Sequence, residues 1–156
     1  MKLHVAADWV EAPLKALVND ARVEIAVLLH PTGQVLGQYG FARSVDVVTA
    51  CALAAAIHSS SAELGRRLDG KPFVGMHYAG PTKQIFIAPV PIMGGTLLLL
   101  AVFDQESSLG LVQLFFKEFC AALANVAPQW QGAESAIATD FEQELNKNLA
   151  LMFGRA

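Results

Sequence analysis

The segment from Val45 to Ala62 constrains this chain most, because its only charged residue is Asp46. Its alanine-rich composition predicts a long helix that begins with a cap at Ser44 and ends near Leu68, before Asp69-Gly70-Lys71-Pro72. A helix that is apolar almost all round must be covered almost all round. In so small a domain, a helix that lies on a sheet has one face in water, so we expect something else to cover that face.

Small and apolar residues recur along this helix at spacings of four and three, which is typical of a seam between packed helices. These residues are Ala50, Ala54, Ile57, Ser61, Leu64 and Leu68. Our interpretation is that two copies of the helix pack together in a homodimer. The alternative is an alanine-rich surface helix that tolerates water. The composition favours the dimer, since 54% of the chain is hydrophobic and only 16% is charged, against about 25% in typical domains.

The remaining segments predict an α+β fold. Five segments have the composition of strands, at 23–29, 34–40, 73–79, 84–90 and 96–103. We expect a first helix from Asp8 or later, because Pro13 is tolerable only near the first turn, and a third helix capped by Ser107 or Ser108. The order α-β-β-α-β-β-β-α and the short loops predict one five-stranded antiparallel sheet with helices on both faces. The strand at 96–103 is apolar on both faces and should be central.

The C-terminal part has a different pattern. We expect a domain over residues 1–127, a linker at 128–133 and an amphipathic helix at 134–156. One apolar stripe follows that helix: Ile137, Phe141, Leu145, Leu149, Met152 and Phe153. Such a helix on a tether either folds back on its own domain or docks in a groove on a partner. The sequence leaves both alternatives open.

Motifs for catalysis, metal or phosphate binding are lacking. The four histidines, His4, His30, His58 and His77, have no metal-ligand spacing, and no glycine-rich phosphate loop occurs. We therefore expect no cofactor, no enzymatic activity and no binding of GTP by the chain itself. A net charge of −3 without a run of Lys or Arg gives nucleic-acid binding little support.

The cysteines and the apolar segments bear on the cellular compartment. Cys51 and Cys120 stand in apolar segments, where buried free thiols are typical, and free thiols fit a reducing cytoplasm. The most apolar stretch, residues 85–103, is interrupted by Pro89 and Pro91 and by two glycines. It is too broken to span a membrane. We expect a cytoplasmic protein that does not insert into a membrane.

Three segments resemble the roadblock, or dynein light-chain, family, which has a longin-like fold. The first is the turn Leu29-His30-Pro31-Thr32-Gly33-Gln34-Val35-Leu36, and the second is the alanine-rich helix from Asp46 to Leu68. The third is the most specific: a last strand and helix start at Val102-Phe103-Asp104-Gln105-Glu106-Ser107-Ser108-Leu109-Gly110-Leu111-Val112. Within the family, the chain is most similar to the bacterial MglB type, the partner of a Ras-like GTPase in cell-polarity control.

The resemblance implies a homodimer in which the third strand pairs across the two-fold axis and the second helices lie side by side as a platform for the GTPase. It implies that the chain accelerates GTP hydrolysis by the GTPase without inserting an arginine into the GTPase. It also implies that a C-terminal helix contacts the GTPase at a separate place and favours nucleotide exchange. The implied dimer and partner residues are Val47, Ala50, Cys51, Ala54, Ile57, His58, Ser61, Leu64, Phe73, Gly75 and His77. The implied docking residues of the tail are Phe141, Leu145, Leu149 and Phe153.

Two rival functions remain at this point. A roadblock protein could act only as a scaffold, with no effect on hydrolysis. A sensory domain that holds a small ligand is the other alternative, and it needs a cavity with convergent polar groups. The strands of this chain offer few such groups.

Overall fold

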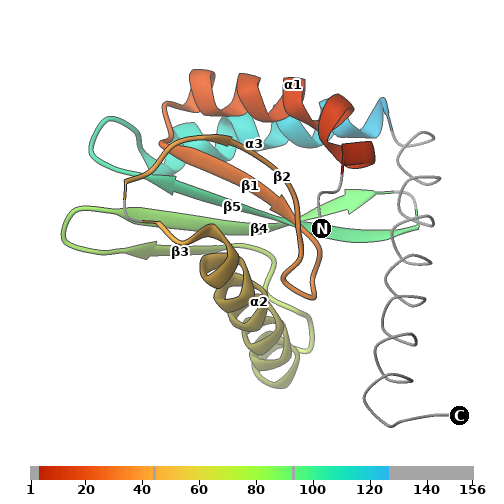
Figure 1. Cartoon of the computed structure of the whole chain (residues 1–156). Helices are drawn as coiled ribbons and strands as arrows, with labels where there is room; N and C mark the ends of the chain where they lie inside the picture. The colour runs from red at the N-terminus through yellow and green to blue at the C-terminus, as the bar shows by residue number, and fades with distance from the viewer. Residues whose placement is uncertain (1–3, 44, 93, 127–156) are drawn as a thin grey trace, which may run out of the picture.

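The computed structural model describes residues 4–43, 45–92 and 94–126 (Figure 1). The elements are α1 (His4–Ala21), β1 (Ile25–Leu29), β2 (Val35–Gly40), α2 (Val47–Asp69), β3 (Met76–Ala79), β4 (Gln84–Ile92), β5 (Gly95–Phe103) and α3 (Leu109–Ala124). This order confirms the predicted α-β-β-α-β-β-β-α arrangement. The predicted linker and C-terminal helix, with Phe141, Leu145, Leu149 and Phe153, lie outside the described residues.

The five strands form one antiparallel sheet in the order β2-β1-β5-β4-β3. β5 is the central strand, as predicted, and every residue from Leu97 to Phe103 is buried. Hairpin turns join β1 to β2, β3 to β4 and β4 to β5, whereas α2 carries the chain from one edge of the sheet to the other. The two outermost strands, β2 and β3, are therefore both next to an end of α2.

Helices cover both faces of the sheet: α1 and α3 lie on one face and α2 on the other (Figure 1). The alternation of β5 side chains builds a core on each side. Leu97, Leu99, Ala101 and Phe103 pack with α1 and α3, while Leu98, Leu100 and Val102 pack with Cys51, Ala54 and Ala55 of α2. One fully apolar strand thus anchors both layers.

The helix starts differ from the prediction. α1 begins at His4, before Asp8, and includes Pro13 in its interior. The proline removes one backbone donor, but fully buried Val10 and Leu14 anchor the same part of the helix to the sheet.

α2 is capped by Asp46 rather than Ser44: its carboxylate accepts hydrogen bonds from the Thr49 N–H (3.2 Å) and the Thr49 hydroxyl (2.7 Å). A carboxylate stabilises a helix N-terminus because it accepts hydrogen bonds from the free N–H groups and interacts favourably with the positive end of the helix dipole.

The two strands before β5 also have different bounds from those expected. β3 begins at Met76 instead of Phe73, and β4 continues to Ile92 through Pro89 and Pro91. β3 pairs only with residues 84–87 of β4. Beyond Ile87, β4 is itself an edge strand, and prolines are tolerated at an edge because one side of the strand needs no donor.

Candidate functional site

The rotation of α2 about its axis decides which side chains it presents to solvent. Cys51, Ala54, Ala55, Ala62 and Gly65 are its buried residues. Its exposed large hydrophobic residues are Val48 (73% exposed), Leu53 (59%), Leu64 (51%) and Leu68 (71%). The sheet therefore covers only one face of the helix.

Most of the exposed apolar residues belong to one flank of α2. We call this flank the α2 stripe: Ala50, Leu53, Ile57, Ser61, Leu64 and Leu68, at spacings of three and four. Ala50, Ile57 and Ser61 are half-buried and the three leucines are exposed. Among the residues predicted from the sequence, Cys51 and Ala54 lie in the core of their own domain, and Val47 and His58 are half-buried. Leu53 was missed by the sequence analysis.

The α2 stripe faces the half of the sheet that ends in β3. On the opposite flank of the helix, the turn between β1 and β2 packs so closely that a Cβ on Gly33 would lie 3.1 Å from the Ala52 Cα. Since β1 and β2 form one side of the sheet, the stripe points to the side of β4 and β3. Ile57 of the stripe packs against the same core cluster as Met76 of β3 and Ile85 of β4.

The return segment from α2 to β3 lies directly on the helix. A Cβ on Gly65 would come within 2.5 Å of the Phe73 nitrogen and 2.7 Å of the Lys71 oxygen. Gly65 therefore allows a close approach that any larger residue would prevent. This contact keeps Phe73 (40% exposed) and Val74 (71% exposed) beside α2, so the apolar surface continues from the helix to the edge of the sheet.

β3 is an edge strand with an open side. It pairs with β4, and no other strand in the described part of the chain pairs with it. Tyr78 is 49% exposed, and a Cβ on Gly75 would meet no atom within 4 Å. His77 is held in place, because its Nε2 lies 2.7 Å from Gln84 Oε1 and its ring stacks on Phe103 with centroids 6.0 Å apart. An exposed, apolar edge of this kind is a template for pairing with another chain.

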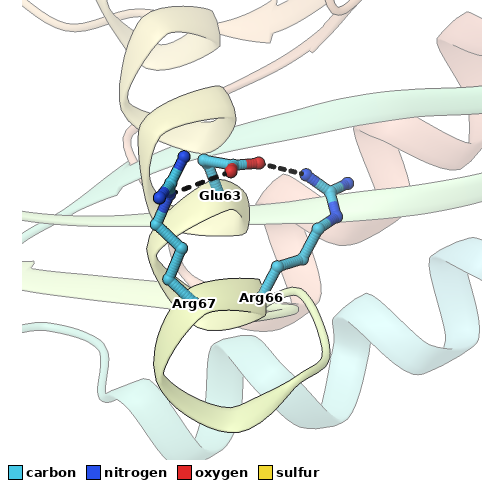
Figure 2. A network of polar contacts seen from close by, with 3 residues as sticks. All are labelled: Glu63, Arg66 and Arg67. Atoms are coloured by element: carbon cyan, nitrogen blue, oxygen red, sulfur yellow. Dashed lines mark hydrogen bonds and ion pairs between the residues drawn. The ribbon is translucent and has the colours of Figure 1, made fainter.

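The charged groups gather at the C-terminal end of α2 (Figure 2). Glu63 accepts hydrogen bonds from Arg66 Nη1 (3.2 Å) and Arg67 Nε (3.1 Å), and all three side chains are more than half exposed. Burial, and then the charge of Arg66, lower the pKa of His58, which favours the neutral imidazole. The α2 stripe therefore has no charged side chain beside it from Ala50 to Ser61, and charged side chains flank it from Glu63 onward.

The chemistry of these side chains suits contact more than catalysis. Within the residues that the structure describes, no three His, Cys, Asp or Glu side chains come together as a metal site. Burial raises the pKa of the Cys51 and Cys120 thiols to about 11, which disfavours the reactive thiolate. A hollow of about 200 Å³ lies between α1 and α3, away from the stripe, and its lining is mostly apolar.

α2 is also long and apolar enough, by length and composition alone, to cross a membrane. The expectation from the sequence that no segment spans a membrane rested on the strand region at 85–103 alone. One such helix is weak evidence for a span. Here the preceding strand β2 and the following strand β3 belong to the same sheet, so both ends of α2 return to one folded unit.

Comparisons with known proteins find the same architecture in solved structures. No protein-family model matches the chain, and no curated protein sequence matches it. MglB of Myxococcus xanthus has a similar structure, with a TM-score of 0.68 and 22% identity over 76% of this chain and 94% of that chain. For the gliding protein MglB from Thermus thermophilus the TM-score is 0.70, with 23% identity over 80% and 92% of the two chains.

A roadblock/LC7 domain from Streptomyces avermitilis has a TM-score of 0.63, with 21% identity over 77% of this chain and 96% of that domain. At these identities the similarity establishes the fold. The described chain therefore has the roadblock fold that the sequence resemblance predicted, in the arrangement found in MglB.

Proposed function

We propose that this chain is a homodimeric regulator of, or docking platform for, a Ras-like small GTPase, and that it does no chemistry by itself. The observation that supports this most is the exposed α2 stripe beside the open edge of β3. The two features lie on the same half of the molecule, so one partner that covers the edge also meets the stripe.

A second copy of the chain fits both features at once. Two β3 edges that pair antiparallel across a two-fold axis join two sheets into one, and both α2 helices then lie on the same face of the joined sheet. The three exposed leucines of each copy lose part of their contact with water. Burying each half-exposed leucine contributes about 1 kcal/mol, so the paired stripes add several kcal/mol to the edge hydrogen bonds.

The GTPase partner rests on the resemblance in sequence and on the shared fold. The resemblance to the MglB type implies a Ras-like GTPase as the client of the paired helices. Val48 supports a second contact, because it is 73% exposed and lies on the flank of α2 away from the stripe. A dimer through the stripe leaves that flank free for a client.

A GTPase assay tests the proposal. Each Ras-like GTPase of the source organism is mixed with the full chain, and co-elution and single-turnover GTP hydrolysis are measured. We expect one GTPase to co-elute and its hydrolysis rate to change. Binding without a change in rate indicates the scaffold function instead, and the absence of binding to every such GTPase contradicts the proposal.

Two matched variants connect this assay to the surface. Leu64→Lys changes a leucine of the stripe that is 51% exposed, and Leu114→Lys changes a leucine of α3 that is 54% exposed on the other side of the sheet. We expect Leu64→Lys to abolish co-elution and the rate effect, and Leu114→Lys to keep both. Equal behaviour of the two variants would mean that the stripe has no special role.

A further inference from the structure

We propose that the C-terminal segment of this chain, residues 134–156, docks in the groove between α1 and α3 of its own domain. α1 and α3, which line the groove, lie on the face of the sheet opposite α2 (Figure 1). The proposal is therefore independent of the dimer and of the GTPase, and each can fail without the other.

The groove has an apolar floor and small residues at its rim. Leu17 of α1 with Phe115 and Phe119 of α3 provide the floor, and Ala16 and Ala122 leave room above it, in a hollow of about 200 Å³. Small residues at a rim let a further helix approach closely.

The outer surface of α3 also lacks the polarity expected of a helix in water. Its sixteen residues include only two charged ones, Lys117 and Glu118. Leu114 is 54% exposed, and the other uncharged exposed positions are mostly small: Gly110, Gln113, Ala121 and Ala124. A surface helix normally has a charged or polar outer face, so this one is expected to be covered.

The position of the chain end favours the chain's own tail as the cover. The described chain leaves α3 at Ala124, two residues after Ala122 of the groove. Residues 127–133 reach at most about 23 Å when extended, which is ample for a turn back. A helix over residues 137–153 would be about 25 Å long, and α3, with sixteen residues, is about 24 Å long. A tail helix antiparallel to α3 therefore matches the groove in length.

The tether itself also favours the chain's own tail. A tethered segment has an effective concentration in the millimolar range, which favours the chain's own groove over that of a second copy.

Hydrogen–deuterium exchange of the full chain tests the docking. We expect the amides of residues 137–153 to exchange at least tenfold more slowly than in the free peptide of the same sequence. Ala16→Arg fills the groove and should remove this protection. Asn19→Arg adds the same side chain to an exposed position of α1 that does not line the groove, and should leave the protection intact.

A charge placed in the tail gives a second, independent readout. Leu145→Asp, in the apolar stripe, should weaken the protection of the tail, and Gln143→Asp, on the opposite side of the same helix, should leave it intact. Fast exchange of the tail in the unmodified chain would overturn the proposal. So would protection that survives Ala16→Arg, or protection that disappears on dilution, which would mean that the tail covers a second copy. Light scattering on the same samples reports the dimer separately.

Discussion

Gly40 is the residue whose backbone has the least freedom to change. Its φ of +97° is rarely adopted by residues with a side chain, and a Cβ there would overlap the Glu24 carbonyl oxygen, next to the start of β1. We predict that Gly40→Ala lowers the free energy of unfolding by about 2 kcal/mol, measured by urea denaturation. Gly110→Ala is the control, because a Cβ at that helical position meets no atom within 4 Å. It should raise stability by up to about 1 kcal/mol.

Cys51 shows how burial controls reactivity at a single residue. The side chain is 0% exposed and burial raises its pKa to about 11, so very little thiolate exists at neutral pH and it is out of reach of a reagent. We predict that Ellman's reagent modifies Cys51 only as fast as the protein unfolds. The comparison is Cys51→Ala, which should remove the slow phase. Rapid labelling of Cys51 in the folded protein would contradict the packing of α2 on the sheet.

At the scale of one element, α2 should make the free energy of unfolding depend measurably on pH. Burial, and then the charge of Arg66, lower the pKa of His58 below its usual 6.5, so the unfolded chain binds a proton more readily than the folded chain. Stability is therefore full above the usual pKa and is lost as the pH falls toward the lowered value. Urea midpoints between neutral pH and about pH 5 should fall less for His58→Gln than for the unmodified chain. An unchanged slope would exclude His58 as the cause.

The same helix shows which features the sequence can predict. Its existence and its C-terminal end follow from composition and from Gly70, whose φ of 76° and N–H bond to the Arg66 oxygen end the helix. Its rotation does not follow, because polar side chains normally mark the solvent face, and Thr49 is the only polar residue from Val47 to Ile57. The predicted seam therefore included Ala54, which packs on the sheet, and omitted Leu53, which is 59% exposed.

Other elements also have some features that the sequence predicts and others that it does not. The central place of β5 was predictable because both of its faces are apolar, which only an inner strand tolerates. The length of α1 was not, because burial of Val10 and Leu14 outweighs the donor lost at Pro13. The close contact of Gly65 with Phe73 was also hidden, since it depends on a chain reversal that brings the return segment back onto the helix.

At the scale of the whole molecule, the two faces of the sheet have separate tasks in our account. One face has α1 and α3, with a groove that we assign to the chain's own tail. The other has α2, whose stripe and neighbouring β3 edge we assign to a second copy. Because the two surfaces are on opposite sides, changes at one should not affect occupancy of the other.

Dimer formation through the α2 stripe is tested most directly by the mass of the full chain in solution, measured by light scattering over a range of concentrations. We expect a mass of twice 16.7 kDa for the unmodified chain and for Leu114→Lys, and a mass near 16.7 kDa for Leu64→Lys, which places a charge in each of the paired stripes. A single-chain mass for the unmodified protein at every concentration, or a Leu64→Lys variant that stays a dimer, would show that the stripe does not pair two copies.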